Sequence, residues 1–361
     1  MLISSFHHIE IAGISAAVPT RQVPVEAYIE AFGEEAVAKF SKMTGVKSVY
    51  RSVSEQTASD LGYEAARNLI HKTGCNTDDL GILVFVTQKP DYRSPSTACV
   101  LHKRLGMQKD CSVFDVNMGC SGYVYGLQLV FSMLNSSDVT GALLITGDTS
   151  TRTMSPYDRS TIMLFGDGAT ATLIKKTSQD NPAYISLRTD GNGYQAIITL
   201  AGAFRNIDAP KKRVMWSDGN FRSEHDTYIN GVDVFNFTIS EVPKLMQEFM
   251  DYLGTDPGVY DIFALHQANT YILKQLSRKL KIPMEKIHIT MDRYGNTSSN
   301  SIPLVLVDAY GEQEKQRVRT FLSGFGIGLS WGCVDISLAV DQIYPVIYSD
   351  EFYAGGGVRH A

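Results

Sequence analysis

This 361-residue sequence alternates strand-like apolar runs with helix-like segments, and that alternation constrains its fold more than any other feature. Three continuous apolar runs are typical of strands covered on both faces: residues 81–88, 141–150 and 169–174. A helix is predicted over residues 57–74, with Thr57 as its N-cap and Gly74 at its end. Residues 95–106 predict another helix, because a proline is accepted in the first helical turn and a glycine ends it. This alternation indicates an α/β fold with a mostly parallel sheet.

The second half of the chain repeats this plan in weaker form. Four segments carry it: helix-like residues 232–254, strand-like residues 261–269, helix-like residues 270–282 and a closing pair of strands in residues 319–340. The polar stretch at residues 175–182 is interpreted as a linker. We therefore predict two similar halves, residues 1–177 and 178–361, with a site between them at the carboxyl ends of the strands.

The composition fits a globular protein and argues against several classes of function. Hydrophobic residues make up 44% of the chain and charged residues 20%, so a large core can form. A net charge of -5 without a long basic cluster argues against nucleic-acid binding. No apolar run reaches the about 18 residues of a membrane span, and residues 1–19 predict a first strand rather than a signal peptide. We expect a cytoplasmic protein.

The five cysteines, Cys75, Cys99, Cys111, Cys120 and Cys333, show no paired spacing. This scattered, odd set predicts neither a disulfide framework nor a metal site, and we expect no cofactor. Four of the cysteines lie in ordinary helix, strand or loop sequence and are interpreted as structural. Cys120 differs from them because of its place in the sequence.

Cys120 lies at a corner between a strand-like run, residues 111–116, and a helix-like run, residues 123–134. Gly119 and Gly122 flank it and permit a tight turn with close approach of a substrate. The start of a helix favours negative charge, so we expect the thiolate of Cys120 to be stabilised there. This corner is typical of a nucleophile.

Partners for such a nucleophile have to come from distant parts of the sequence. His266 follows an apolar strand-like run, and Asn296 follows a glycine in a predicted tight turn. Glycines in residues 323–332 let backbone N–H groups face a pocket. Each feature alone also has a structural explanation: a satisfied histidine, an N-capped turn and a bulged hairpin.

Four motifs occur in order along the chain: DxxxxCSG at 115–122, HQAN at 266–269, GNTSxxSIP at 295–303 and GFGxGxxWG at 324–332. In this order and spacing the chain resembles β-ketoacyl-acyl-carrier-protein synthase III, in the condensing-enzyme branch of the thiolase superfamily. Residues 44–46, 94–99 and 158–171 extend the resemblance, which covers essentially the whole chain. It implies an α/β, thiolase-like, five-layered αβαβα fold and a homodimer. It also implies acyl carrier protein or acyl-CoA thioesters as partners.

The resemblance assigns catalytic roles. Cys120 attacks a primer thioester and forms an acyl-enzyme. The backbone N–H groups of Cys120 and Ile327 form the oxyanion hole. His266 and Asn296 donate hydrogen bonds to the thioester carbonyl of a malonyl extender and stabilise the enolate that decarboxylation leaves. Neutral donors suit this role, because the carbonyl gains negative charge without losing a proton.

Four residues of the matching motifs are expected to contact substrate: Arg159, Ser94, Phe325 and Asn269. Arg159 matches an arginine on the adenine side of coenzyme A. Ser94 stands where acetyl-specific relatives have a phenylalanine that closes the acyl pocket across the dimer. We expect a deeper cavity and acyl chains longer than acetyl, unless Tyr92 or Arg93 fills the space.

Other positions depart from the family. Lys39 and Met43 stand where a tryptophan and an arginine normally bind coenzyme A. Tyr271 replaces an arginine after HQAN, and Val232 replaces an asparagine. We infer that catalysis is retained while recognition of the carrier is changed, so that the donor or acceptor is protein-bound or is not the standard coenzyme A ester.

The expected function is therefore decarboxylative Claisen condensation of an acyl primer with a malonyl thioester, in fatty-acid or specialised lipid or polyketide synthesis. Two alternatives remain. One is an acyltransferase of the same fold that passes the acyl group to an alcohol or amine. The other is a silent partner subunit of a heteromeric synthase. Retention of Cys120, His266 and Asn296 argues against both.

Overall fold

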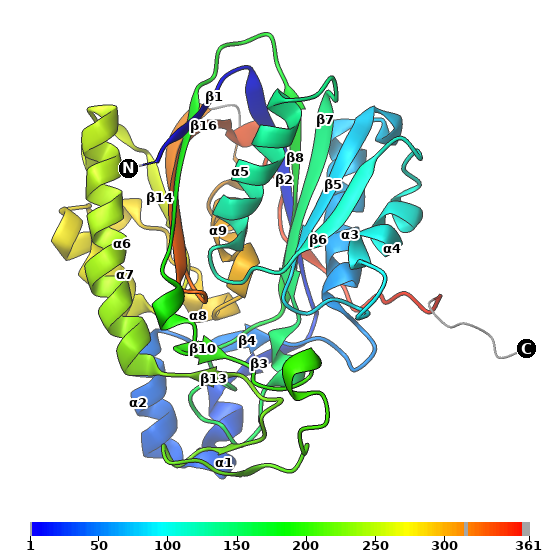
Figure 1. Ribbon diagram of the computed structural model, residues 1–361. Helices are drawn as coiled ribbons and strands as arrows, with labels where there is room; N and C mark the ends of the chain where they lie inside the picture. Colours follow the sequence, from blue (N-terminus) through cyan, green and yellow to red (C-terminus); the bar gives the residue numbers. More distant parts are fainter. Residues whose placement is uncertain (1, 314–316, 356–361) are drawn as a thin grey trace, which may run out of the picture.

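Two large β-sheets and three layers of helices form the body of the protein (Figure 1). The computed structural model describes residues 2–313 and 317–355. The first sheet has the strand order β17 (Ile347–Tyr348), β2 (Ile9–Val18), β8 (Gly168–Lys176), β7 (Gly141–Asp148), β5 (Leu80–Val86) and β6 (Ser112–Val116). The second has the order β1 (Ser4–Phe6), β9 (Ala183–Thr189), β16 (Ser330–Ala339), β15 (Arg317–Gly326) and β14 (Ile262–Leu265).

Helices lie outside and between these sheets (Figure 1). The outer face of the first sheet carries α3 (Ala58–Thr73) and α4 (Thr97–Leu105). The outer face of the second carries α6 (Gly231–Leu253), with α7 (Thr270–Leu280) beside it. The middle layer consists of α5 (Gly122–Asn135) and α9 (Ser301–Tyr310), which contact strands of both sheets. The layer order αβαβα confirms the predicted architecture.

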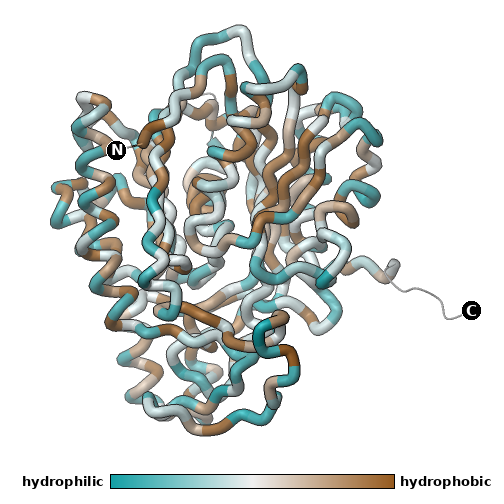
Figure 2. Tube along the Cα trace, in the orientation of Figure 1, coloured by the Kyte–Doolittle hydropathy of each residue, from teal (hydrophilic) through white to brown (hydrophobic). Residues whose placement is uncertain are grey.

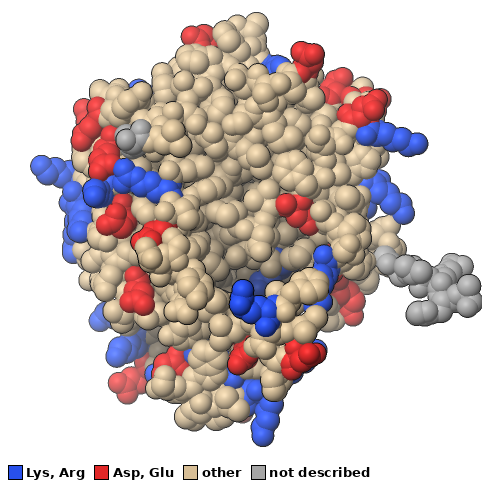
Figure 3. All heavy atoms as spheres, viewed as in Figure 1, with Lys and Arg blue, Asp and Glu red and all other residues tan. Residues whose placement is uncertain are grey.

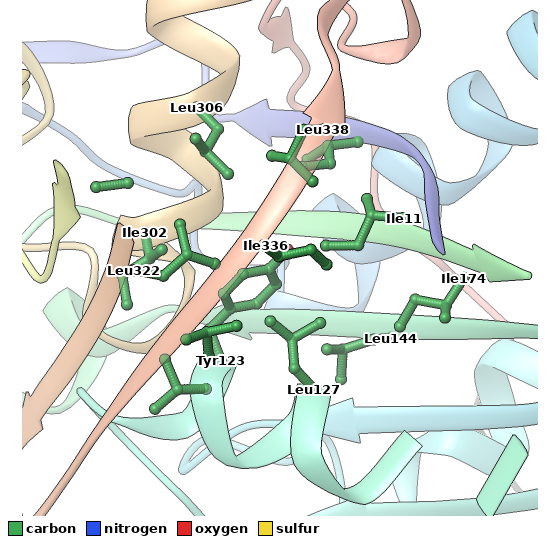
Figure 4. Close-up of a cluster of buried hydrophobic side chains, with 14 of the residues drawn as sticks. Ile11, Tyr123, Leu127, Leu144, Ile174, Ile302, Leu306, Leu322, Ile336 and Leu338 are labelled. Carbon is green, nitrogen blue, oxygen red and sulfur yellow. The ribbon is translucent and has the colours of Figure 1, made fainter. Parts of the chain in front are cut away.

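The middle layer is the hydrophobic centre of the molecule. Tyr123 and Leu127 of α5 and Ile302 of α9 are fully buried. Figure 4 shows helical side chains meeting side chains from strands of both sheets: Ile11, Leu144, Ile174, Leu322, Ile336 and Leu338. The strands on either side of this layer are correspondingly apolar (Figure 2). Both sheets therefore rest on the same two helices.

Short elements form a cap below the two sheets as seen in Figure 1. They are α1 (Ile29–Phe32), α2 (Glu34–Thr44), β3 (Gln22–Pro24), β4 (Ser48–Tyr50), β10 (Ile197–Ile198) and β13 (Tyr228–Ile229). Three further short elements are α8 (Met291–Tyr294), β11 (Val214–Met215) and β12 (Phe221–Arg222). In the described ranges, 2–313 and 317–355, every helix is too short or too polar to cross a bilayer.

The prediction of one first strand in residues 1–19 is wrong. His8 has a φ of 57°, and the chain turns there into two strands. β1 joins the second sheet, whereas β2 joins the first. A single left-handed residue at an exposed position leaves little trace in the hydrophobic pattern, so the break was not visible in the sequence.

The prediction of a mostly parallel sheet is confirmed for the first sheet, in which three of five strand pairs are parallel, and is wrong for the second, in which one of four is. β7, β5 and β6 run parallel to one another, but β2 and β7 both pair antiparallel with β8. In the second sheet only β14 and β15 are parallel. Residues 327–329 alone join β15 to β16, and so short a connection requires an antiparallel pair.

The helix predicted over residues 95–106 begins later than expected. α4 starts at Thr97, and Pro95 precedes it in a cis peptide bond with Ser94. The carboxylate of Asp115, in β6, accepts hydrogen bonds from the backbone N–H groups of Thr97 (2.6 Å) and Ala98 (2.7 Å). This cap from a neighbouring strand fixes where the helix starts. By contrast, α3 has the predicted Thr57 N-cap and ends at Gly74.

Residues 177–182, within the predicted linker, lead from β8 in the first sheet to β9 in the second. The division at residues 177 and 178 stays a prediction. A strand from each end of the chain belongs to the sheet formed mainly by the other half. β1 pairs with β9 in the second sheet, and β17 pairs with β2 in the first.

A backbone contact joins the N-terminal half of the sequence to the turn that carries Asn296. Asn296 donates its N–H to the carbonyl of Leu164 (2.8 Å), and its own carbonyl accepts from Gly166 N–H (3.1 Å). A Cβ on Gly166 would lie 2.1 Å from the carbonyl oxygen of Tyr294. Backbone atoms cannot yield as a flexible side chain can, so only glycine fits.

We therefore expect Gly166→Ala to lower the free energy of unfolding by about 1–3 kcal/mol through overpacking. Gly191→Ala is the matched control, because no atom lies within 4 Å of its Cβ position. Urea denaturation of both variants measures the difference. Equal midpoints for the two variants would show that the contact is not tightly packed.

Candidate active site

The carboxyl ends of three parallel strands lie side by side at one edge of the first sheet. β5, β7 and β6 end at Val86, Asp148 and Val116, and their following loops meet there. Loops at this edge of a parallel sheet are where α/β proteins build their sites. A cavity of about 2150 Å³ opens at this edge and is lined by Cys120, His266 and Asn296 together.

The sulfur of Cys120 is packed against the glycine-rich turn. A Cβ on Gly326 would lie 2.8 Å from Sγ, so only glycine allows this approach. The backbone N–H of Ile327 is close enough to the thiol to lower its pKa. Ser121 Oγ lies 2.6 Å from Ser330 Oγ and fastens the start of α5 to β16. These contacts hold the corner in one place relative to the turn.

The expectation of a stabilised Cys120 thiolate is wrong for the unliganded site. Burial raises the pKa of Cys120 to about 11, and the nearby carboxyl group of Asp148 acts in the same direction. The N–H groups of Ile327 and of Cys120 itself lower the pKa by less than burial raises it. The free-energy cost of removing the thiolate from water exceeds the stabilisation that the N-terminus of α5 supplies.

His266 follows the last residue of β14 and is held on three sides. Its backbone N–H donates to the carbonyl of Ser323 (2.8 Å), and its Nδ1 lies 2.7 Å from Ser301 Oγ in α9. The ring meets Phe325 edge to face, with centroids 5.4 Å apart. Burial lowers the pKa of His266 to about 3, so the ring is neutral. When Ser301 donates to Nδ1, the proton of the neutral ring is on Nε2.

Asn296 sits in a turn that its glycine neighbour makes possible. Gly295 has a φ of 64° and no room for a Cβ, which would lie 2.6 Å from the carbonyl oxygen of Leu164. The side-chain Oδ1 of Asn296 accepts from the backbone N–H of Ser298 (2.9 Å). With its oxygen held by the backbone, the amide offers its NH₂ group to the cavity as a donor.

Three more of the predicted site residues line the cavity: Phe325, Ile327 and Asn269. Asn269 also has a structural role, because its Oδ1 accepts from Ile272 N–H (2.8 Å) and caps α7.

Arg159 and Ser94 do not line the cavity in this chain. Both side chains are exposed. The preceding residue, Asp158, is buried and binds the guanidinium of Arg222, which leaves Arg159 directed to solvent. Motif matching located the segment, but it could not show which of two adjacent side chains points inward.

Residues just before Ser94 occupy the cavity wall instead. Tyr92 and Arg93 both line the cavity. Arg93 donates to the carbonyl of Gly202 (3.1 Å) and lies over the ring of Phe204, 5.1 Å from its centroid. The alternative that these two side chains fill space near Ser94 is thus consistent with their position.

Sequence reasoning missed two polar residues behind the site. Ser301 lies in the GNTSxxSIP motif, where the sequence suggests no role for it, and its Oγ contacts His266. Asp148 is fully buried at the end of β7, and its Oδ1 accepts from Gln88 N–H (2.8 Å) and Thr87 Oγ1 (3.1 Å). Burial raises the pKa of Asp148. No spacing rule in a single sequence would have singled out either residue.

Comparisons with known proteins show the family of this chain. Residues 114–193 match the family model for 3-oxoacyl-[acyl-carrier-protein] synthase III, and residues 250–338 match that for its C-terminal part. The β-ketoacyl-[acyl-carrier-protein] synthase III of Clostridium perfringens is 32% identical over 297 residues, covering 82% of this chain and 89% of its own. That of Vibrio vulnificus is 30% identical over 324 residues, covering 90% and 97%.

This chain belongs to the β-ketoacyl-acyl-carrier-protein synthase III family. The crystal structure of a 3-oxoacyl-(acyl-carrier-protein) synthase from Burkholderia xenovorans superposes with a TM-score of 0.90 at 33% identity, covering 96% of this chain and 99% of its own. The predicted resemblance and the thiolase-like fold are both confirmed. As a synthase III, the chain is a condensing enzyme.

The raised pKa of Cys120 leads to a prediction for this synthase in its unliganded state. Alkylation by iodoacetamide requires the thiolate, so the rate at Cys120 should rise about tenfold per pH unit until about pH 11. Peptide-resolved mass spectrometry measures each cysteine separately, and the exposed Cys99 provides the reference rate. A plateau of the Cys120 rate near neutral pH would contradict the prediction.

Proposed function

We propose that Cys120, His266 and Asn296 carry out the two half-reactions of a decarboxylative Claisen condensation, which makes the enzyme an acyltransferase. The main support is that all three line one cavity while the Ile327 N–H reaches the sulfur of Cys120. The substrate class is an acyl thioester as primer and a malonyl thioester as extender.

In the first half-reaction, Cys120 Sγ attacks the carbonyl carbon of the primer thioester. The bond from that carbon to the carrier sulfur breaks, and the departing carrier sulfur takes up the proton that Cys120 loses. The carbonyl oxygen gains negative charge as the tetrahedral intermediate forms. The backbone N–H groups of Cys120 and Ile327 are proposed to donate to that oxygen.

In the second half-reaction, a malonyl thioester loses CO₂ and becomes an enolate. His266, through Nε2–H, and Asn296, through its NH₂, are proposed to donate to the thioester oxygen where the charge develops. The enolate carbon then attacks the acyl carbon on Cys120, the carbon–sulfur bond breaks, and Cys120 leaves as a thiolate that takes a proton from water. The neutral His266 fits this role, because no proton has to be removed from the substrate.

The carrier is proposed to be an acyl carrier protein or coenzyme A. Five lysine and arginine residues line the cavity: Lys42, Lys89, Arg93, Arg152 and Lys274. In Figure 3, basic side chains lie in the lower half of this face as well as along its left and right edges, with acidic side chains among them. Met43, Val232 and Tyr271, which replace usual coenzyme A contacts, are exposed at 60%, 68% and 51%. Their apolar surface favours a protein-bound carrier.

A homodimer is proposed as the working unit. β6 is an edge strand of the first sheet, and such an edge is open to pairing with a second copy. Most of its side chains are only half-buried in the single chain. The middle of the face on which α5 and β6 lie is largely free of charged side chains (Figure 3), which also fits an interface.

The roles of His266 and Asn296 predict a split between the half-reactions. His266→Ala and Asn296→Ala should still acylate Cys120, but should lose CO₂ release from malonyl thioester by about 10²–10³-fold. Cys120→Ala should form no acyl-enzyme. Intact-protein mass spectrometry measures acylation, and trapped labelled CO₂ measures decarboxylation.

The same experiment tests the alternative of simple acyl transfer to an alcohol or amine. In that case wild-type enzyme would release no CO₂, and Asn296→Ala would leave turnover nearly unchanged. A silent subunit would acquire no acyl group from any thioester.

A second prediction concerns chain length. A cavity of about 2150 Å³ leaves room for more than an acetyl group next to Cys120, even though it must also admit the carrier arm. We expect medium-chain thioesters to acylate Cys120 at least as fast as acetyl thioester in a mass-spectrometric panel. A strong preference for acetyl would show that Tyr92 and Arg93 close the acyl end.

A further inference from the structure

Lys89 places an ammonium group in the wall of the catalytic cavity. It lies three residues after the end of β5, in a loop next to the one that carries Cys120. The adjacent Gln88 packs against Gly119, directly before Cys120, since a Cβ on Gly119 would lie 2.5 Å from its Oε1. The Lys89 backbone N–H donates to Thr87 Oγ1 (2.9 Å), which fixes the start of the loop.

Within residues 2–313 and 317–355, no carboxylate forms an ion pair with Lys89 and no protein acceptor takes a hydrogen bond from its Nζ. Asp148 is the nearby acid, but it lies beyond ion-pair distance, and Gln88 and Thr87 occupy its Oδ1. Asp91, two residues on, accepts instead from Ser59 (2.6 Å).

A cation in such a place is unfavourable without an anionic partner. The Lys89 side chain is half-buried, and burial lowers its pKa while the charge of Asp148 opposes that change. The Nζ of Lys89 is not among the fully buried side-chain nitrogens that lack a partner, so the amine keeps contact with the open cavity. An ammonium that faces a substrate cavity without a protein partner is therefore available to a ligand.

We propose that Lys89 binds a carboxylate at the end of the primer acyl chain, so that the enzyme takes acyl groups derived from dicarboxylic acids. This proposal rests on the proposed acylation of Cys120. Lys89 would act as a specificity-determining residue: it holds the far end of the chain while Sγ attacks the near end. Sγ attacks the thioester carbonyl as in the first half-reaction, and the carrier thiol is the leaving group.

The malonyl extender also carries a carboxylate, but that group is a poorer fit for Lys89. Decarboxylation converts it to neutral CO₂, so an ammonium bound to it would stabilise the reactant more than the transition state and slow the reaction. A carboxylate at the end of the primer remains intact throughout the reaction. Binding it favours the right substrate without opposing a chemical step.

The test uses pairs of thioesters, each carried on acyl carrier protein and on coenzyme A, that match in length and differ in the terminal group: butyryl against succinyl, and hexanoyl against adipyl. Intact-protein mass spectrometry gives the rate of acylation of Cys120 for wild-type enzyme, Lys89→Met and Lys89→Gln. We expect wild-type enzyme to prefer the carboxylate-ended member of at least one pair. Lys89→Met should lower that preference by at least about 30-fold, as expected for loss of a partner to a desolvated charge.

Lys42→Met is the matched control, because Lys42 lines the same cavity but is exposed. A contact with the carrier would affect both members of a pair alike, so this variant should keep the wild-type preference. Thermal unfolding of each variant shows whether it folds. If Lys89→Met does not fold, the preference of wild-type enzyme and of Lys89→Arg still decides the proposal.

Three outcomes would overturn it. Wild-type enzyme could prefer the methyl-ended thioesters, or Lys89→Met could keep the wild-type preference. Alternatively, Lys89→Met could change only CO₂ release from malonyl thioester, which would assign the lysine to the extender. Failure of every thioester to acylate Cys120 would instead refute the proposed function, so the two failures are distinguishable.

Discussion

The burial of α5 and α9 between two sheets is the constraint on which the site depends. Because both faces of each helix are packed, neither helix can slide or rotate without disturbing strands on both sides. Cys120 comes two residues before α5, and Asn296 comes five residues before α9. Ser301, the first residue of α9, contacts His266 at the end of β14. A single packed layer thus sets the relative positions of all three side chains.

The same burial makes the site electrically neutral. It raises the pKa of the thiol at Cys120 and lowers that of the imidazole at His266, so neither carries charge when the site is empty. In a weakly hydrated site, fixed donors interact strongly with charge that appears only during reaction. Hydrogen-bond donors at Asn296 and Ile327 are fixed by the backbone around them. Lys89 is the exception near Cys120, because it places a cationic group beside these neutral side chains.

The resemblance carried by the four ordered motifs predicted the five layers and the residues that line one cavity, whereas local patterns predicted the alternation of strands and helices and the corner at Cys120. A strand-to-helix corner with glycines, as at Cys120, and a glycine before Asn296 each leave a recognisable pattern. Features that depend on residues distant in the sequence could not be predicted. The start of α4 depends on Asp115, and the outward direction of Arg159 accompanies the pairing of Asp158 with Arg222. The mixture of parallel and antiparallel strands could not be predicted, because an apolar run does not show in which direction its strand runs relative to its neighbours.

The first strands of the chain pair with strands from its second half, and this pairing affects how the protein folds during synthesis. β17 pairs with the end of β2, and the N–H of Thr20 donates to Asp350 Oδ1 (3.0 Å). One edge of the first sheet is therefore supplied by residues that are synthesised long after β2. The early half of the chain must wait in an incomplete state while the rest is synthesised. Until β17 has been synthesised and has paired with β2, this edge of the nascent chain is exposed to chaperones and proteases.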